Sequence, residues 1–306
     1  MGQMEDMETF VRIVEAGSIS RAAAQLGVVK SAVSRRLNDL EARLGVQLLA
    51  RTTRTSSLTH AGQQYFSRAQ NVLIEMAEIN AEAAQTSTTL TGTIKLSAPL
   101  SFGLSHLSSV ISDFAKSHPG LTIQMDFNDR QVDLVDEGYD LAVRIADLKN
   151  STLKARKLID IPVILCASPD YVRAHGAPHT PVDLKQHQIL HYTNSGPDSW
   201  LFNTPNGGNT TLTLRAKMRS NNGDFLCQAA VDGHGIILAP SFISWEALCQ
   251  KKLVPLMPDY QPPPITAFAV YPDTRHLPAR IRLLIDTIVD HLKAQPQWRA
   301  PKGSYG

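Results

Sequence analysis

The amino-acid sequence predicts an all-α N-terminal head of the winged helix-turn-helix type, a long linker helix and a C-terminal α/β domain. Three patterns support this prediction: short helical patterns joined by a tight turn, an apolar repeat of about 3.5 residues, and strand patterns that alternate with helical ones. The chain has 306 residues, enough for two or three compact units, and 43% of them are hydrophobic, as is usual for a globular protein.

Residues 1–62 are expected to form the head, with a helix-turn-helix at about residues 19–44. Asp6 is a candidate N-cap of the first helix, Ser20 is a candidate N-cap of the second, and Gly27 can take the left-handed conformation that ends it. The apolar faces are Met7, Phe10, Val11 and Val14 in the first helix, Ala22, Ala23 and Leu26 in the second, and Val33, Leu37, Leu40 and Leu44 in the third.

Positive charge is concentrated in this part of the chain. Residues 21–54 carry a net charge of +5, whereas the whole chain carries +2. A third helix that turns small polar and basic side chains outward has the form that enters a DNA major groove, and the basic, β-branched stretch after it predicts a two-stranded wing. The expected DNA contacts are Lys30, Ser31, Ala32, Ser34 and Arg35 of the helix, and Arg51, Thr52, Thr53 and Arg54 of the wing.

A structural role is the alternative for some of these charges. Arg35, Arg36 and Arg43 could form a solvated helix face paired with Asp39 and Glu41 at helical spacing. We favour that interpretation for Arg36 and Arg43, and DNA contact for Arg35.

The chain resembles the LysR-type transcriptional regulators in three motifs. They are AGSISRAAAQLGV, SAVSRRLNDLEARLGVQLLAR, and RTTRTSSLTHAG at the start of a long helix. One departure is that Val29 and Lys30 stand where the family usually has Ser and Gln. The N-cap hydroxyl is then missing, so Ser31 or a DNA phosphate is expected to satisfy the free N–H groups, and Lys30 could donate to a guanine or to a phosphate.

A linker and dimerisation helix is predicted over residues 63–90, continuing a helical pattern that starts at His60. Its apolar positions follow the spacing of a coiled-coil seam: Tyr65, Ala69, Val72, Met76, Ile79 and Ala83. A helix with such a stripe cannot bury it alone, so we expect it to pair with its twin in a homodimer or, as in similar proteins, a homotetramer.

The remaining residues, 91–306, are predicted to alternate strands and helices, which favours a parallel sheet. Strands are expected at 94–98, 121–128, 140–145, 161–167, 189–192, 212–218, 235–240 and 266–272, and helices at 104–116, 132–137, 224–231, 242–248 and 279–292. The resemblance implies an effector-binding domain with the two-lobed type II periplasmic-binding-protein fold. Lobe 1 would be about 91–161 with 268–306, and lobe 2 about 162–267.

A small-molecule effector is expected at the carboxyl ends of the strands, where helix N-termini offer free N–H groups. Ser97, Pro99, Ser101 and Phe102 follow the first strand and should line one wall, with Ser101 as an alternative helix cap.

Arg144 ends another strand and could hold a carboxylate effector, or instead pair with Asp126, Asp129 or Asp140. The family's layout places Ser220, Asn221 and Asn222 at the cleft, although Asn222 could serve only as a helix cap.

Other classes of protein have little support. Cys166, Cys227 and Cys249 show no CxxC spacing, the histidine pairs lack the HExxH pattern, and no catalytic triad or nucleotide loop is evident, so no metal, cofactor or enzymatic activity is expected. No apolar run reaches the roughly 20 residues of a membrane span. The acidic start MGQMEDMETF predicts no signal peptide and hence a cytoplasmic location.

The sequence therefore predicts a regulator whose partners are an operator duplex, a small-molecule effector, further copies of the chain and, as a candidate, RNA polymerase. Two rivals remain: a two-lobed solute receptor, and an enzyme that uses the cleft with His187, His191 or Arg144.

Overall fold

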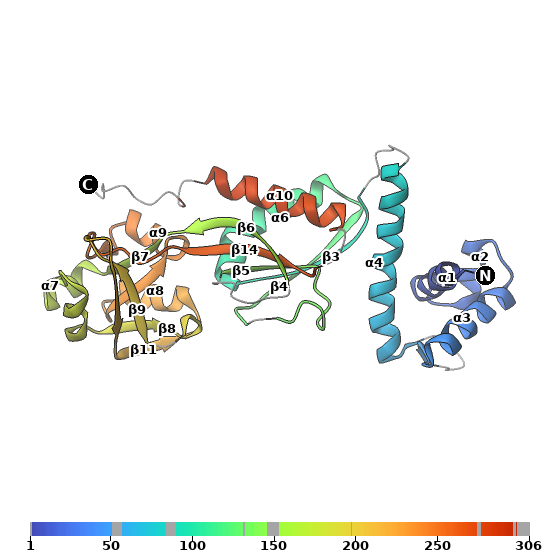
Figure 1. Ribbon diagram of the computed structural model, residues 1–306, viewed down its shortest axis with the longest axis horizontal. Helices are drawn as coiled ribbons and strands as arrows, with labels where there is room; N and C mark the ends of the chain where they lie inside the picture. Colours follow the sequence, from blue (N-terminus) through green and yellow to red (C-terminus); the bar gives the residue numbers. More distant parts are fainter. Residues whose placement is uncertain are drawn as a thin grey trace. The chain divides into compact units, whose positions relative to one another are not determined.

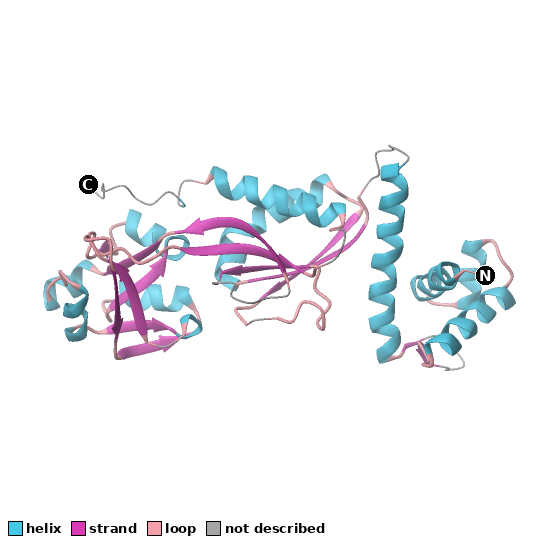
Figure 2. Cartoon of the chain, in the orientation of Figure 1, coloured by secondary structure: helices cyan, strands magenta, loops and turns pink. Residues whose placement is uncertain are grey.

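The computed structural model describes residues 2–50, 57–83, 90–130, 132–145, 153–196, 198–273, 277–295 and 298 (Figure 1). The chain forms two compact units, residues 1–93 with 118–122, and residues 94–117 with 123–306. Figure 2 shows mainly helices and one short pair of strands in the first unit, and mixed helices and strands in the second.

The head begins with α1 (Gln3–Ala16), α2 (Ile19–Leu26) and α3 (Lys30–Leu44). The predicted stripes form its core, in which Phe10, Val33 and Leu40 are fully buried. The exception is Leu44, which is 37% exposed at the end of α3 and lies outside the core. The short strands β1 (Leu49–Ala50) and β2 (Ser57–Leu58) pair antiparallel, so both sides of the predicted wing begin as strands.

Both predicted N-caps of this region are wrong. The N-cap of α2 lies two residues earlier than expected: the hydroxyl of Ser18, rather than Ser20, accepts from the backbone N–H of Arg21 at 3.3 Å. Helix α1 starts at Gln3 after Gly2, so Asp6 lies inside the first turn. Its buried carboxylate accepts from Arg43 instead of capping.

Helix α4 (His60–Ala83) is the predicted linker, about 36 Å long for its 24 residues. The apolar stripe divides along it. Tyr65 and Ala69 pack into the core of the head, where the Tyr65 ring lies edge-on to Phe10, with 5.5 Å between centroids. Val72, Met76 and Ile79 are 40%, 37% and 52% exposed, so only the later half of the stripe is left for another surface.

The second unit contains a lobe whose five-stranded sheet has the order β4-β3-β5-β14-β6. Its strands are β3 (Gly92–Ala98), β4 (Leu121–Phe127), β5 (Leu141–Ile145), β6 (Lys154–Ile161) and β14 (Ile265–Tyr271). Helices α6 (Ser108–Ser117) and α10 (Ala279–Ala294) pack against each other beside it (Figure 1). The chain enters α6 through α5 (Leu100–Phe102) and a π-helical turn, η1 (Gly103–Leu107).

The other lobe has a five-stranded sheet of order β11-β8-β12-β7-β13. The strands are β7 (Val163–Ala167), β8 (Ile189–Tyr192), β11 (Ala216–Ser220), β12 (Ile236–Pro240) and β13 (Val254–Pro255). A hairpin of β9 (Ser199–Asn203) and β10 (Asn209–Thr213) stands apart. The helices are α7 (Pro169–His175), α8 (Gly223–Val231) and α9 (Ser241–Cys249), with 3-10 turns η2 (Pro181–Gln186) and η3 (Thr193–Ser195).

The chain crosses between the lobes twice. It passes from β6 to β7 at Pro162, and it returns between Pro255, the end of β13, and Ile265, the start of β14. These two connections, with the cleft between the lobes, give the two-lobed arrangement that the resemblance implied.

Several details differ from the sequence prediction. The predicted helix at 132–137 is absent: residues 134–138 form a turn, in which the Asp133 carboxylate accepts from the N–H groups of Val135 and Asp136. The stretch 212–218 is split between β10 and β11, and between them the Leu214 N–H donates to the backbone carbonyl of Asp198. The sheets are mixed: β3 and β5 are parallel, whereas β14 runs antiparallel to β5.

Candidate nucleic-acid interface and effector cavity

The outward face of α3 carries the residues expected to contact DNA. Lys30, Ser31 and Arg35 are exposed, while Ala32 and Ser34 are half-buried. The other predicted contacts lie outside the described residues: Arg51, Thr52, Thr53 and Arg54.

The N-terminus of α3 has no side-chain cap. Val29 occupies the N-cap position and makes no capping hydrogen bond, as its substitution for Ser implied. Free N–H groups at a helix N-terminus carry partial positive charge, to which exposed Lys30 adds a full charge. This end of α3 is therefore electrostatically suited to a phosphate.

Two arginines of α3 face α1 instead. Arg36 donates to the Glu5 carboxylate at 3.1 Å and to the Thr9 hydroxyl at 3.4 Å, and Arg43 donates to Asp6 at 3.0 Å. Their predicted structural role is correct, but the predicted partners on the same helix are wrong. The bonds join α3 to α1, because both arginines lie on the side of α3 that meets that helix.

Glu41, one of those predicted partners, has a different role. Its carboxylate is buried and accepts from the backbone N–H groups of Leu48 at 2.7 Å and Leu49 at 3.0 Å. It therefore fixes the turn that leads from α3 into the first strand of the wing.

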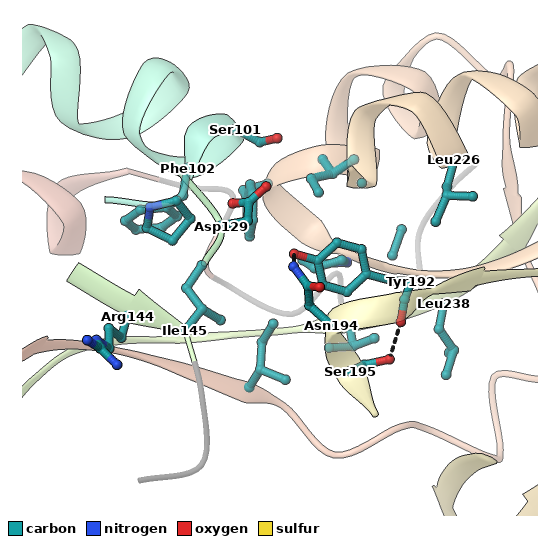
Figure 3. Close-up of a pocket in the computed structure, with 18 of the residues that line it drawn as sticks. Ser101, Phe102, Asp129, Arg144, Ile145, Tyr192, Asn194, Ser195, Leu226 and Leu238 are labelled. Carbon is teal, nitrogen blue, oxygen red and sulfur yellow. Dashed lines mark hydrogen bonds between the residues drawn. The ribbon is translucent and has the colours of Figure 1, made fainter. Parts of the chain in front are cut away.

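A cavity of about 790 Å³ lies between the two lobes (Figure 3). Most of its lining is apolar, with a few polar side chains, as is usual for small-molecule sites. The predicted residues Ser97, Pro99, Ser101, Phe102 and Arg144 all line it. Several other lining residues were not predicted from the sequence, among them Asn128, Asp129, Tyr192, Asn194, Trp200 and Phe242.

The other predicted group lies away from the cavity. Ser220, Asn221 and Asn222 are described by the structure and are not among the residues that line the cavity. Asn222 is the N-cap of α8 and accepts from the N–H of Phe225 at 2.8 Å, and Ser220 accepts from the N–H of Asn222 at 3.0 Å. The alternative that Asn222 caps the helix is therefore correct.

Ser101 connects the lobes rather than capping a helix. Pro99 occupies the N-cap position of α5, and the Ser101 hydroxyl donates to the carboxylate of Asp224, in the first turn of α8 of the other lobe. The N–H of Leu100, beside it, donates to the Asp129 carboxylate at 3.2 Å.

Arg144 makes none of the three ion pairs weighed from the sequence. Its guanidinium donates to the carbonyl of Val132, and no ion pair joins it to Asp126, Asp129 or Asp140 among the residues that are described. Burial lowers the pKa of Arg144, against the opposing effect of the nearby carboxylates. In Figure 3 its guanidinium points away from the group formed by Asp129 and Tyr192.

Aromatic side chains from both lobes meet beside the cavity. The centroid of the Phe102 ring lies 5.3 Å from the ring centroid of Phe242 in α9. The corresponding centroid distances to His106 and Trp298 are 5.5 Å and 6.0 Å. His106 is buried, and burial lowers its pKa, which favours the neutral imidazole within this apolar cluster.

Two family models match the chain. One, "Bacterial regulatory helix-turn-helix protein, lysR family", covers residues 4–63, and the other, "LysR substrate binding domain", covers residues 87–293. The chain belongs to the LysR family. The boundaries of the two matches correspond to the head and to the two-lobed domain.

Relatives of similar length support this assignment. A transcriptional regulator of Haemophilus influenzae is 34% identical over 92% of this chain and 98% of its own length. PtxR of Pseudomonas aeruginosa is 33% identical over 96% of this chain and 94% of its own length. Among solved structures, CrgA of Neisseria meningitidis is 32% identical, with a TM-score of 0.60, over 95% of this chain and 99% of CrgA. Full-length AphB of Vibrio cholerae is 26% identical, with a TM-score of 0.59, over 94% of this chain and 99% of AphB.

This LysR-family chain is thus a transcriptional regulator rather than an enzyme. The histidines of the enzymatic alternative do not line the cavity: His187 contacts the hydroxyl of Tyr171 at 3.2 Å, and His191 is buried beside Gly196 and Asp198. Across the described ranges, no group of three or more His, Cys, Asp or Glu could hold a metal, and no helix is long and apolar enough to cross a bilayer.

The three cysteines are free. Cys166 and Cys227 are buried and Cys249 is exposed. Burial raises the pKa of Cys227 to about 11 and raises that of Cys166 as well, so both thiols stay protonated at neutral pH.

Proposed function

We propose that this LysR-family regulator binds operator DNA through α3 and the wing, and that a small molecule in the cavity between its lobes alters that binding. The cavity carries the proposal, because residues of both lobes line a single apolar space of about 790 Å³. A ligand there contacts both lobes at once and so has different affinities for different lobe arrangements. That difference is the requirement for shifting the population of DNA-binding states.

On the DNA side, the proposed contacts are Lys30, Ser31, Ala32, Ser34 and Arg35, together with Arg51, Thr52, Thr53 and Arg54 of the wing. Support for the helix contacts comes from the exposed or half-buried positions of these side chains and from the uncapped N-terminus of α3. On the effector side, the proposed contacts are Ser97, Pro99, Ser101, Phe102 and Arg144. The carboxylate effector that Arg144 suggested stays a prediction.

The working unit in this proposal is a homodimer or homotetramer in the cytoplasm. The exposed half of the α4 stripe, formed by Val72, Met76 and Ile79, supports it, since a solvent-exposed apolar row on a long helix is stabilised by pairing with a second copy. Two heads held in this way would read a two-part operator, and contact with RNA polymerase would follow at the promoter.

A mobility-shift assay tests the proposal. The full chain should retard duplex DNA from upstream of its own coding region. The combined variant Lys30→Ala, Ser34→Ala and Arg35→Ala should lose that complex. Arg12→Ala, which removes one exposed positive charge from α1, is the control and should keep it. Equal retardation by both variants would reject α3 as the recognition helix.

A further inference from the structure

Two carboxylates already use the donors at the end of the cavity next to α5, although only Asp129 is among the lining residues. Asp129 accepts from the N–H of Leu100, and Asp224 accepts from the hydroxyl of Ser101. These N–H and hydroxyl groups are the donors that a carboxylate effector would use. An incoming carboxylate would therefore find both donors occupied and would be repelled by two like charges at close range.

The two arginines that line the cavity donate to groups other than Asp129. Arg130 forms a two-bond ion pair with Glu137. Arg144 donates to the Val132 carbonyl, with its guanidinium turned away from Asp129 (Figure 3). Within the part of the chain that the structure describes, Asp129 has no ion-pair partner, and its carboxylate lies in the space bounded by Ser101, Tyr192 and Asn194 (Figure 3).

Aromatic walls lie in the same cavity as Asp129. Tyr192 and Phe242 line the cavity and are half-buried, so part of each side chain is accessible, whereas Phe102 behind them is fully buried. The faces of aromatic rings attract cations. A carboxylate and accessible aromatic rings together suit a ligand that carries a positive charge.

We propose that the effector is an organic amine with an apolar body, whose ammonium group is held by Asp129 while its body lies against Tyr192 and Phe242. This inference rests on the proposed function, because it takes the cavity as the effector site. It reverses the charge that the sequence suggested from Ser101 and Arg144. The Ser101–Asp224 bond and the Leu100–Asp129 bond, neither visible in the sequence, are the reason.

Three probes of similar shape test the charge: phenylpropylamine, phenylpropionate and phenylpropanol, each titrated into the full chain by calorimetry at neutral pH. We expect the amine to bind at least about tenfold more tightly than the other two, because desolvated charge pairs contribute at least that much to affinity. Asp129→Asn should remove this preference. The control, Asp113→Asn, removes an exposed carboxylate from α6 and should preserve it.

The Asp129→Asn variant should fold, because the asparagine oxygen can still accept from the Leu100 N–H; an unchanged unfolding midpoint would verify this. Equal or tighter binding of phenylpropionate, an unchanged preference in Asp129→Asn, or no binding of any probe at millimolar concentration would overturn the inference. If the Asp129→Asn variant is unstable, the relative affinities of the unaltered chain for the three probes still test the inference. If phenylpropionate binds and alters DNA affinity, the amine inference fails while the proposed function survives. If the ligand-free chain retards no DNA, the proposed function itself fails.

Discussion

Replacing Glu41 with Ala should destabilise the head selectively. The Glu41 carboxylate is 9% exposed and accepts from the N–H groups of Leu48 and Leu49, whose residues are 1% and 7% exposed. Each buried N–H left without an acceptor costs about 1–3 kcal/mol. Since water can partly replace the missing carboxylate, we expect a loss of about 2–4 kcal/mol of unfolding free energy. Glu41→Gln keeps an acceptor and should lose only about 1 kcal/mol, the charge-assisted part of the bonds.

The chain offers a way to observe this loss in the head alone. All three tryptophans, Trp200, Trp245 and Trp298, belong to the second unit, so their fluorescence during urea unfolding reports only on that unit. Far-UV ellipticity reports on the helices of both units. Glu41→Ala should move the ellipticity transition to lower urea and leave the tryptophan transition in place.

Asp39→Ala is the matched control, because Asp39 lies on the same helix with an exposed side chain and should change stability by no more than about 0.5 kcal/mol. If Glu41→Ala and Asp39→Ala unfold at the same urea concentration, the two hydrogen bonds do not stabilise the head and the reasoning is refuted.

Further predictions concern recognition, folding and reactivity. Arg35→Ala should weaken operator binding by about 1–3 kcal/mol in fluorescence anisotropy if Arg35 reads a base edge; an affinity equal to that of the unaltered chain would reject the contact. Asn222→Ala should lower the urea midpoint of tryptophan fluorescence through loss of about 1 kcal/mol of capping, with Asn221→Ala as the control, and equal midpoints would contradict the cap. At mildly alkaline pH, a thiol reagent should modify Cys249 rapidly. Cys166 and Cys227 should react only on unfolding or as pH rises toward their raised pKa values, and rapid labelling of all three thiols would disprove their burial.

The sequence predicted the elements of the head well, because local rules determine them. The three-and-four spacing of Phe10, Val33 and Leu40 identifies the buried faces whatever the helices pack against. The predicted N-cap of α2 was wrong by two residues, because Ser18 and Ser20 are both suitable capping residues and the structure uses Ser18. The partners of Arg36 and Arg43 could not be predicted either, because Glu5 and Asp6 lie on a different helix, 31 and 37 residues earlier.

Prediction of the cavity was limited for a related reason. Ser97 and Ser101 follow a strand end, a local signal, and they do line the cavity. Asp129 and Tyr192 face the same space from different lobes, and no spacing in the sequence indicates that folding brings them together. The capping role of Asn222 is as local as that of Ser18, and an Asn before a helix rich in apolar residues signals a cap more directly than a ligand contact.

The central claim is that the basic head binds duplex DNA through electrostatic attraction to its phosphates. Fluorescence anisotropy of the full chain with a labelled upstream duplex, repeated across a series of salt concentrations, tests it most directly. We expect the logarithm of the binding constant to fall linearly with the logarithm of salt concentration, as phosphate neutralisation requires, and Lys30→Ala to reduce the slope by about one. Binding that is absent at low salt, or that is independent of salt, would contradict it.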